Sequence, residues 1–600
     1  MNKTYLSVAI AAVFALSACG GSSNNVNVTP AVVPGNVLLD SNRIAFMDFA
    51  SPANSLTTIG AVTGLTLGDT LVSIDRRPQN GFLYGLGYNS VADTVTLYVI
   101  HPETKVATSL GFAGGFTTDG INPAQIGNSS TRFEIDFNTA VDRIRVINSL
   151  GKNFRMNPNT GTVVDGNNGL VAPATLPAGT NMDGALNGTS VTAQGTAYVN
   201  NVANNGGITT QYTIDENSDN LFIQSPPNEG TLSDPKELTP RISSVLGFDI
   251  APGVSVTANN NPVTTGSGYL LMRSGANTAE SLATVNLVTG AISNITAIAG
   301  GATARGIAVQ NPESNAAIAL SSDGTQLVRF AISKPATTTT TVVITGVTMG
   351  ESLVGIDFRP ATGQLFALGV NPTADNGTVY LIDPQNGAAS AIGTQGSIAF
   401  VDAMGAPVDL PDPTIETYGF DFNPSVDRIR ITTSTGLNLR LNQVTGTPVD
   451  GDPVAAGANP DGGIKGSNVT GASGAAYTNS VASAPGMGTT SLYILSNTGS
   501  QLTIQNPPNE GTQTLPLTVR LNGSTLAYTR VNGFDIPSDV RVAANNAAVT
   551  NGSGLAALTV GGTTSLYRIN LATGSATNLG AIGTGMATYR GLALGQTHAR

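Results

Sequence analysis

Residues 353–393 read LVGIDFRPATGQLFALGVNPTADNGTVYLIDPQNGAASAIG. Four short runs rich in β-branched, aliphatic and aromatic residues, LVGIDFRP, QLFALG, TVYLIDP and AASAIG, are separated by turn-forming residues. Four antiparallel strands joined by tight turns are what one blade of a β-propeller requires. Long windows with a helical period are almost missing from the chain, since Gly or Pro interrupts nearly every dozen residues. The sequence therefore predicts an all-β fold built from four-stranded blades.

The chain carries a long internal duplication, because segments near residue 60 recur about 282 positions later. Residues 64–89 align with residues 346–371, and the sequence PPNEGT at 226–231 returns unchanged at 507–512. Blade-like units number about five in each copy. They lie near residues 40, 75, 136, 198 and 249 in the first copy and near 320, 357, 421, 477 and 535 in the second.

The ends of the two copies indicate how each ring closes. Residues 305–308 (RGIA) and 590–593 (RGLA) resemble the first strand of a blade without the rest of the blade, and each copy opens on a blade that lacks this strand. Pairing the two would remove exposed sheet edges. We therefore expect two separate propellers, module 1 at residues 37–310 and module 2 at residues 311–600. The alternative, one continuous ring of about ten blades, exceeds the usual four to eight.

The N-terminus has the pattern of an export signal. Lys3 precedes an apolar run over residues 5–16, which is shorter than the roughly 20 residues of a membrane-spanning helix. The following LSAC resembles the lipobox of bacterial lipoproteins, and its Cys19 is the only cysteine in the chain. We expect cleavage in front of Cys19 and lipidation of its thiol with diacylglycerol and of its amino group with a further acyl chain such as palmitate. An ordinary secretory peptide with Cys19 as a bystander is the alternative.

This interpretation predicts a signal peptide at 1–18, a lipidated tether at 19–36 and residence in the bacterial cell envelope. Gly20 rather than Asp follows the cysteine, a pattern that resembles outer-membrane lipoproteins. The expected partners are the membrane, through the lipid, and an envelope protein or glycan. A net charge of −11 argues against binding to nucleic acid. No thiol follows Cys19, so the fold must rest on its core without disulfides.

Histidine chemistry is nearly excluded, since only His101 and His598 are present. Module 2 has Asp383 at the position of His101, so the two copies cannot share a histidine-dependent mechanism. A zinc site or a Ser-His-Asp triad needs more than this. The sequence also lacks a Gly-x-Ser-x-Gly elbow and a phosphate-binding loop. We predict no catalytic residue, no metal ligand and no cofactor, and expect a protein that is not an enzyme.

Acidic residues recur at matching positions on the predicted first strands of the blades. They are Asp75, Asp136 and Asp249 in module 1 and Asp357, Asp421 and Asp535 in module 2. First strands line the channel of a propeller, so these carboxylates would form a ring that binds a cation or a sugar, or flanks a glycosidic bond. We favour a structural role in Asp/Arg pairs between blades, since Asp357 and Arg359 lie two apart on one strand and share a face.

Two other motifs have a functional and a structural interpretation. The repeated PPNEGT suits a rigid outer turn, but its Glu229 and Glu510 could equally serve recognition. Residues 215–220 (DENSDN) carry oxygen-bearing side chains at alternate positions, as a calcium loop does, yet the required Gly and distal Glu are missing. For this segment we favour a solvated hairpin loop.

Three stretches, GIDFRPATGQL at 355–365, DFNPSVDRIR at 421–430 and NLRLN at 438–442, resemble the bacterial domain-of-unknown-function family numbered 4394. The resemblance covers both modules, and the second is the closer match. The first departs from it with Arg76 in place of Phe358 and Thr139 in place of Pro424. For function, the resemblance implies only an exported bacterial domain without assigned catalytic residues.

The sequence thus favours a lipid-anchored propeller protein that acts as a binding or interaction scaffold, because propellers present broad loop faces on a rigid frame. A carbohydrate-active or lactone-type hydrolase that uses the channel carboxylates is one alternative. A structural surface component that self-assembles is another.

Overall fold

The computed structural model describes residues 32–596 except 54–55, 167–177, 204–205, 251, 276–278, 299–302, 311–315, 338–339, 484–485 and 487. The expected signal peptide and Cys19 lie outside these residues. Residues 34–36, which we assigned to the tether, belong instead to the first strand. In the described part of the chain, no helix combines the length and the hydrophobicity needed to cross a membrane.

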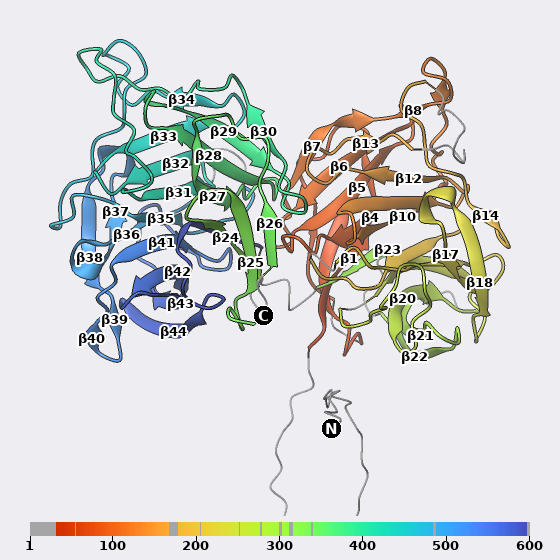
Figure 1. The fold of residues 1–600 in the computed structure, drawn as a ribbon. Coiled ribbons are helices and arrows are strands. Elements are labelled where there is room, and N and C mark those ends of the chain that lie inside the picture. The colour runs from red at the N-terminus through yellow and green to blue at the C-terminus, as the bar shows by residue number, and fades with distance from the viewer. Residues whose placement is uncertain are drawn as a thin grey trace, which may run out of the picture.

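Module 1 is a ring of five four-stranded antiparallel blades (Figure 1). In chain order its strands are β1 (Pro34–Leu39), β2 (Arg43–Asp48), β3 (Thr57–Ala61), β4 (Thr70–Arg76), β5 (Leu83–Asn89), β6 (Thr94–Ile100), β7 (Ala107–Gly114), β10 (Phe133–Asn138), β11 (Arg143–Asn148), β12 (Asn153–Met156), β13 (Val163–Val164), β15 (Gly195–Tyr198), β16 (Gln211–Asp215), β17 (Asn220–Gln224), β18 (Thr231–Glu237), β19 (Ser244–Asp249), β20 (Ser267–Arg273), β21 (Ser281–Asn286), β22 (Ile292–Ala297) and β23 (Ala304–Val309). Short additions are β8 (Phe116–Thr117), β9 (Pro123–Ala124) and β14 (Asn187–Gly188).

Module 2 repeats the arrangement with five further blades. Its strands are β24 (Ala316–Ser321), β25 (Gln326–Ala331), β26 (Thr340–Val343), β27 (Ser352–Phe358), β28 (Leu365–Asn371), β29 (Asn376–Ile382), β30 (Ala389–Ile392), β31 (Tyr418–Asn423), β32 (Arg428–Thr433), β33 (Asn438–Asn442), β34 (Thr447–Val449), β35 (Gly474–Tyr477), β36 (Leu492–Ser496), β37 (Gln501–Gln505), β38 (Gln513–Thr518), β41 (Arg530–Asp535), β42 (Ser553–Val560), β43 (Thr563–Asn570), β44 (Ser575–Ala581) and β45 (Tyr589–Leu594). The short strands β39 (Arg520–Leu521) and β40 (Ser524–Thr525) extend the last blade.

Each ring is closed by its own last strand. β23 pairs antiparallel with β1, and Ile307 lies opposite Val37. β45 pairs in the same way with β24, where Ala593 lies opposite Ile318. The inner strands β4, β10, β15, β19 and β23 contact one another in a ring, as do β27, β31, β35, β41 and β45. The predicted pair of closed five-bladed propellers is confirmed, and the single ten-bladed ring is wrong.

Packing between neighbouring blades explains why the repeated sequence is apolar and rich in glycine. Tyr84 of β5 meets Phe137 of β10 edge to face at 5.1 Å, and their counterparts Phe366 and Phe422 repeat this contact at 5.1 Å. Glycine is needed where inner strands approach closely. A Cβ on Gly533 of β41 would lie 2.6 Å from the backbone nitrogen of Leu592 on β45.

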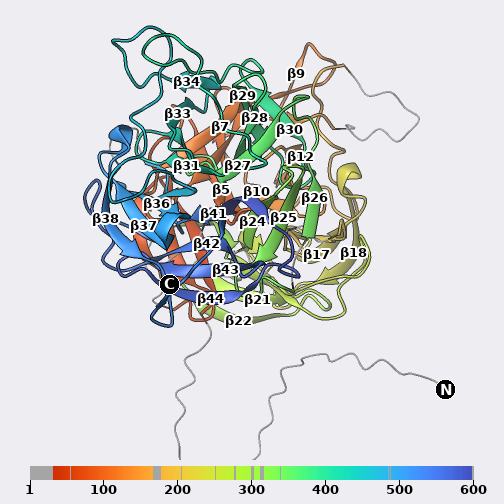
Figure 2. The same cartoon turned by 60° about the vertical axis from the view of Figure 1, so that its left-hand side comes forward.

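The two modules lie side by side and touch through turns that follow their inner strands (Figures 1 and 2). Asn80, after β4, donates through Nδ2 to the carbonyl of Gly363 at 2.7 Å and accepts from the backbone N–H of Gln596 at 2.8 Å. Arg329 donates to the carbonyl of Gln79 at 2.8 Å. The inner strands of both modules therefore end towards the interface and begin on the sides that face away from it.

Candidate functional site

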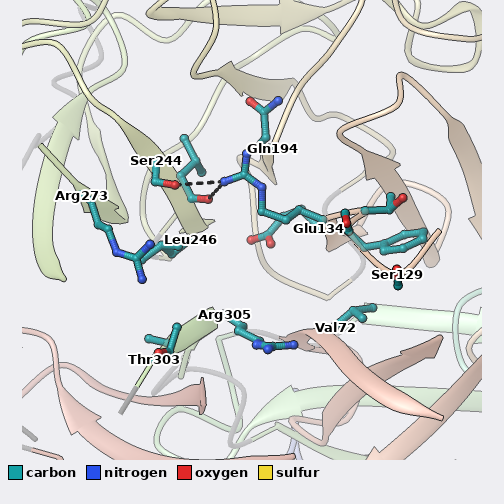
Figure 3. A pocket seen from close by; sticks show the side chains of 15 residues that line it. Val72, Ser129, Glu134, Gln194, Ser244, Leu246, Arg273, Thr303 and Arg305 are labelled. Atoms are coloured by element: carbon teal, nitrogen blue, oxygen red, sulfur yellow. Dashed lines mark hydrogen bonds between the residues drawn. The ribbon is translucent and has the colours of Figure 1, made fainter. Parts of the chain in front are cut away.

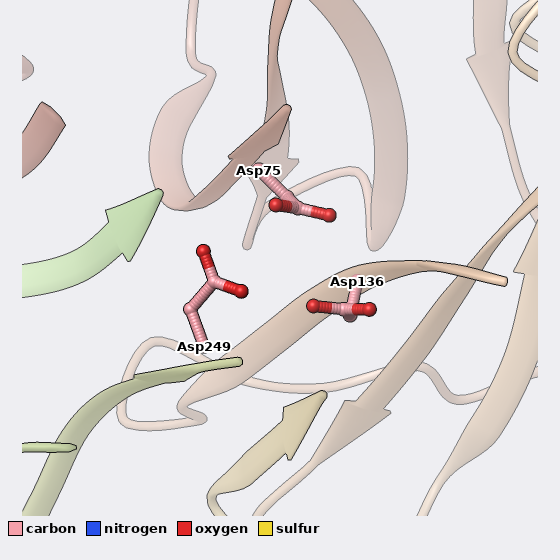
Figure 4. Close-up of side chains that lie close together, drawn as sticks. All are labelled: Asp75, Asp136 and Asp249. Carbon is pink, nitrogen blue, oxygen red and sulfur yellow. The ribbon is translucent and has the colours of Figure 1, made fainter. Parts of the chain in front are cut away.

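The six predicted acids form two buried carboxylate triads, one in the channel of each module. The triads are Asp75, Asp136 and Asp249, and Asp357, Asp421 and Asp535. Within each triad, one oxygen from every carboxylate lies within 4.8 Å of the others. Figure 4 shows the three carboxylates of module 1 pointing towards one another from β4, β10 and β19. The acids lie near the ends of their strands and hence on the side of the channel nearer the other module.

Each triad carboxylate also binds the backbone of a neighbouring inner strand. Asp75 Oδ2 accepts from the N–H of Phe137 on β10 at 2.8 Å, and Asp136 Oδ1 accepts from the N–H of Tyr198 on β15 at 2.9 Å. Asp249 Oδ2 accepts from the N–H of Val309 on β23 at 2.6 Å. These bonds join one blade to the next around the channel.

Module 2 repeats these bonds. Asp357 Oδ2 accepts from the N–H of Phe422 at 3.0 Å, and Asp421 Oδ1 accepts from the N–H of Tyr477 at 3.2 Å. Asp535 Oδ2 accepts from the N–H of Leu594 on the closing strand at 2.7 Å. The acids recur in the sequence because the same carboxylate-to-backbone bonds are made twice.

Burial raises the pKa of every triad carboxyl. Desolvation raises the pKa of Asp249 and of Asp535 to about 7. The pKa values of Asp75 and Asp136 are raised well above the ordinary range by burial and by the negative charge of their triad neighbours. Backbone hydrogen bonds act in the opposite direction but are the smaller effect. These shifts favour the protonated form of the triad carboxyls compared with ordinary aspartates.

Our sequence prediction named no metal ligand, yet the triads place carboxylate oxygens as close together as a cation site requires. The structure also corrects the expected pairing of these acids with arginine. Arg359 does not neutralise Asp357; its Nε donates instead to Asp427 at 2.9 Å. The error arose because sharing a strand face does not determine which neighbouring blade a long arginine side chain reaches.

Buried arginines have other acidic partners, which sequence reasoning missed. Arg430 Nη1 donates to Asp461 Oδ2 at 2.6 Å, and Arg440 Nη2 donates to Asp461 Oδ1 at 2.6 Å. In module 1, Asp183 holds Arg145 and Arg155 in the same way. A signal for this acid was present, because the pattern Asn-x-Asp-Gly recurs at 181–184 and 459–462.

The repeated PPNEGT forms a short turn that docks on this network. Asn509 Oδ1 accepts from Arg430 Nη2 at 2.7 Å, and Asn228 Oδ1 accepts from Arg145 Nη2 at 2.5 Å. Glu510 is exposed and lies 4.0 Å from the exposed Lys465. The asparagine of the motif, which we had not singled out, thus contacts a buried arginine, whereas the highlighted Glu510 reaches only the exposed Lys465. Glu229 occupies the corresponding place in module 1.

The possible calcium loop at 215–220 and His101 both include buried side chains. Residues 215–220 span the end of β16, the turn at 216–219 and the start of β17. Asp215 is buried rather than solvated, and it accepts hydrogen bonds from Ser190 and Thr192 at 2.8 and 3.0 Å. His101 is also buried, and burial lowers its pKa to about 3.

An open pocket lies at the mouth of the module 1 channel where the inner strands begin (Figure 3). Its volume is about 280 Å³, and residues at or next to the start of all five inner strands line it. Three of its lining residues are arginines: Arg132, Arg273 and Arg305. At the corresponding mouth of module 2, Arg530, Arg590 and Tyr418 line crevices of about 0 and about 10 Å³.

Comparison with known proteins gives a family but no function. No curated protein matches the chain. Among solved structures, the chain is similar to the Dos1 propeller at 10% identity, with a TM-score of 0.22 and coverage of 65% of this chain and 82% of that one. For a chain of the nidogen/laminin complex the values are 10% identity, a TM-score of 0.27, and 46% and 98% coverage.

A family model, described as a domain of unknown function (DUF4394), matches residues 43–308 and again residues 326–593. The two matched regions coincide with the two closed rings and together span most of the chain. The resemblance inferred from the repeated motifs is therefore confirmed for both copies. The protein belongs to the DUF4394 family and carries two tandem copies of its domain.

Proposed function

We propose that the protein is a lipoprotein of the bacterial cell envelope that binds an envelope component through its propellers without transforming it. The observation that carries this proposal is the open pocket of about 280 Å³ at the mouth of module 1. Residues from all five blades line it, so the closed ring fixes its shape. Cys19, if lipidated, would hold this pocket at a membrane surface, where envelope glycans and proteins are within reach.

The geometry of the two triads does not suit hydrolysis of a glycosidic bond and therefore favours binding without catalysis. Their oxygens lie within 4.8 Å of one another in a buried position, which leaves no space for a sugar ring between them. Each carboxylate already accepts a hydrogen bond from a neighbouring inner strand. A glycosidase needs two carboxyl groups that flank the scissile bond.

A hydrolase remains the second candidate, because raised carboxyl pKa values suit a general acid. Binding and hydrolysis are separated by one experiment on the soluble body, residues 20–600, with polysaccharide purified from the envelope of the source bacterium. Retained polysaccharide and newly formed reducing ends are measured together. The proposal predicts retention without new reducing ends. Reducing ends that form with the native body and disappear with Asp249→Asn and Asp535→Asn would establish the hydrolase instead, and no retention would refute the proposed binding.

A further inference from the structure

The mouth pocket of module 1 contains a positive charge that the protein does not neutralise. Arg132 is paired with Glu216, and its Nη1 also donates to Ser244 Oγ at 3.1 Å. Arg273 Nη2 donates to Glu280 at 2.6 Å. The side chain of Arg305 makes no hydrogen bond or ion pair with any residue in the described part of the chain, and Arg305 is exposed.

The ion pairs Arg132–Glu216 and Arg273–Glu280 also bind the backbone that forms the pocket wall. Glu216 Oε2 accepts from the N–H of Val245 at 2.7 Å, and Glu280 Oε2 accepts from the N–H of Ala304 at 2.7 Å. These two nitrogens lie at the starts of β19 and β23. Arg132 and Arg273 are therefore tied into the wall, whereas Arg305 is available to a ligand.

Glu134 lines the same pocket but forms no ion pair with Arg305 among the residues described. It lies in the wall, 2% exposed, and accepts from the N–H of Phe248 at 3.0 Å and from Ser73 Oγ at 3.3 Å. Burial raises the pKa of Glu134 well above its ordinary value, which favours the neutral form of its carboxyl group. Arg305 is the lining arginine that has no charge partner among the described residues. Figure 3 shows Arg273, Arg305 and Glu134 around the same opening.

The remaining lining suits a ligand rich in hydroxyl groups. Ser129, Ser130 and Thr303 are exposed, and their hydroxyls have no hydrogen-bond partner among the residues described. Val72 and Leu246 supply apolar surface beside them. A volume of about 280 Å³ lies near the lower limit of about 300 Å³ for small-molecule sites, which favours a single sugar ring over a larger body.

We propose that this pocket binds one uronic acid residue, with the carboxylate on Arg305 and the ring hydroxyls on the Ser and Thr side chains. The inference rests on the proposed binding function and names the ligand class. The corresponding crevices of module 2 are too small for a sugar ring, so this mouth site is expected in module 1 alone; a pocket of about 510 Å³ elsewhere in module 2, beside Arg430 and Asn509, does not correspond to it. An Arg305 guanidinium can donate two parallel hydrogen bonds to a carboxylate, which a neutral hexose cannot accept in that geometry.

The test is isothermal titration calorimetry of residues 20–600 with glucuronate, glucose and acetate as probes. Glucose keeps the ring but lacks the carboxylate, and acetate keeps the carboxylate but lacks the ring. We expect glucuronate to bind with one site per chain and at least about tenfold more tightly than either of the other two. Failure of glucuronate to bind, equal binding of glucose, equal binding of acetate, or two sites per chain would each overturn the inference.

Variants assign the binding to the pocket. Arg305→Gln should weaken glucuronate binding by about tenfold to hundredfold, and Arg305→Lys should recover part of it. The matched control is Arg241→Gln. It removes an arginine of the same module that lies outside the pocket and whose side chain is 76% exposed. Unchanged binding in Arg305→Gln would refute the site. Polysaccharide retention without glucuronate binding would refute the ligand class alone, whereas absence of retention would refute the proposed function.

Discussion

The backbone N–H of Val309 donates a hydrogen bond of 2.6 Å to Asp249 Oδ2, so an acid of the fifth blade holds the strand that closes module 1. Leu594 and Asp535 repeat the bond at 2.7 Å in module 2. The same carboxyls belong to the buried triads. Ring closure and the acidity of the channel therefore depend on the same carboxyl groups.

Stability should fall as the pH rises through neutrality. The folded-state pKa of Asp249 and of Asp535 is about 7, above the roughly 3.9 of an unfolded aspartate. The folded chain therefore holds protons that the unfolded chain releases. Each group contributes stability that is complete below about pH 4 and lost as the pH approaches and passes 7, at up to about 1.4 kcal/mol per pH unit.

Urea unfolding between pH 5 and 8.5 measures this effect. Asp535→Asn keeps an acceptor oxygen but cannot titrate, so its stability should depend less on pH than that of the native chain. A stability that instead rises with pH, and does so only when a divalent cation is present, would show that the triads are ionised cation sites.

Module 1 should fold alone, because its closing strand lies within its own sequence. Residues 32–310 should unfold cooperatively, as followed by circular dichroism during heating. Residues 32–302 lack β23 and leave the edge of β1 unpaired, so this shorter piece should aggregate or unfold at a much lower temperature. If both pieces behave alike, self-closure does not stabilise the module.

Within the repeated turn, the asparagine should matter and the glutamate should not. Asn509→Ala removes the acceptor of a buried Arg430 nitrogen and should reduce the free energy of unfolding by about 1.5–3 kcal/mol. Glu510→Ala removes an exposed carboxylate 4.0 Å from Lys465 and should change it by less than about 1 kcal/mol. Urea unfolding of both variants gives the comparison. Equal effects would contradict the structural role of the turn.

Asp461 should be among the most costly acids to remove. It is buried and neutralises both Arg430 and Arg440, so Asp461→Ala leaves a buried guanidinium without its charge partner. We expect a loss of about 3–5 kcal/mol in the free energy of unfolding. Glu103→Gln, in the partly exposed pair with Arg541, is the control and should cost less than about 1 kcal/mol. A small loss in Asp461→Ala would show that water reaches the network.

Most of the fold could be predicted from the sequence, because the strands and turns of one blade follow one another directly along the chain. The duplication also presents each of these patterns twice. Residues 353–393 form β27 to β30 as expected. Residues 305–308 and 590–593 looked in the sequence like first strands without a blade, and each pairs with the first blade of its own module, as predicted. The six acids were identified, but their convergence was not. It depends on the diameter of the ring and on the stagger of inner strands that are about 60 residues or more apart in sequence.

The pocket was harder to predict, because its three arginines come from a loop before β10, from the end of β20 and from the start of β23. Arg305 attracted notice only as part of the closing strand. Arg132 is neutralised by Glu216, which lies far away in the sequence, and Arg273 by Glu280, which lies across the β20–β21 hairpin. The first copy differs from the second here, with Arg132 in place of Thr417 and Glu134 in place of Gly419. These differences at the starts of the inner strands, and not the motifs that the two copies share, are the sequence signal that could have located the pocket.

We propose that the acids of the channel and the arginines of its mouth have separate roles in module 1: the triad acids join strands, and the mouth receives the ligand. The most direct measurement compares the affinity of envelope polysaccharide for residues 20–600 carrying Asp249→Asn with its affinity for the same body carrying Arg305→Gln. We expect unchanged affinity in the first variant, because an asparagine oxygen still accepts from Val309, and weakened affinity in the second. Loss of binding in Asp249→Asn together with full binding in Arg305→Gln would contradict this proposal.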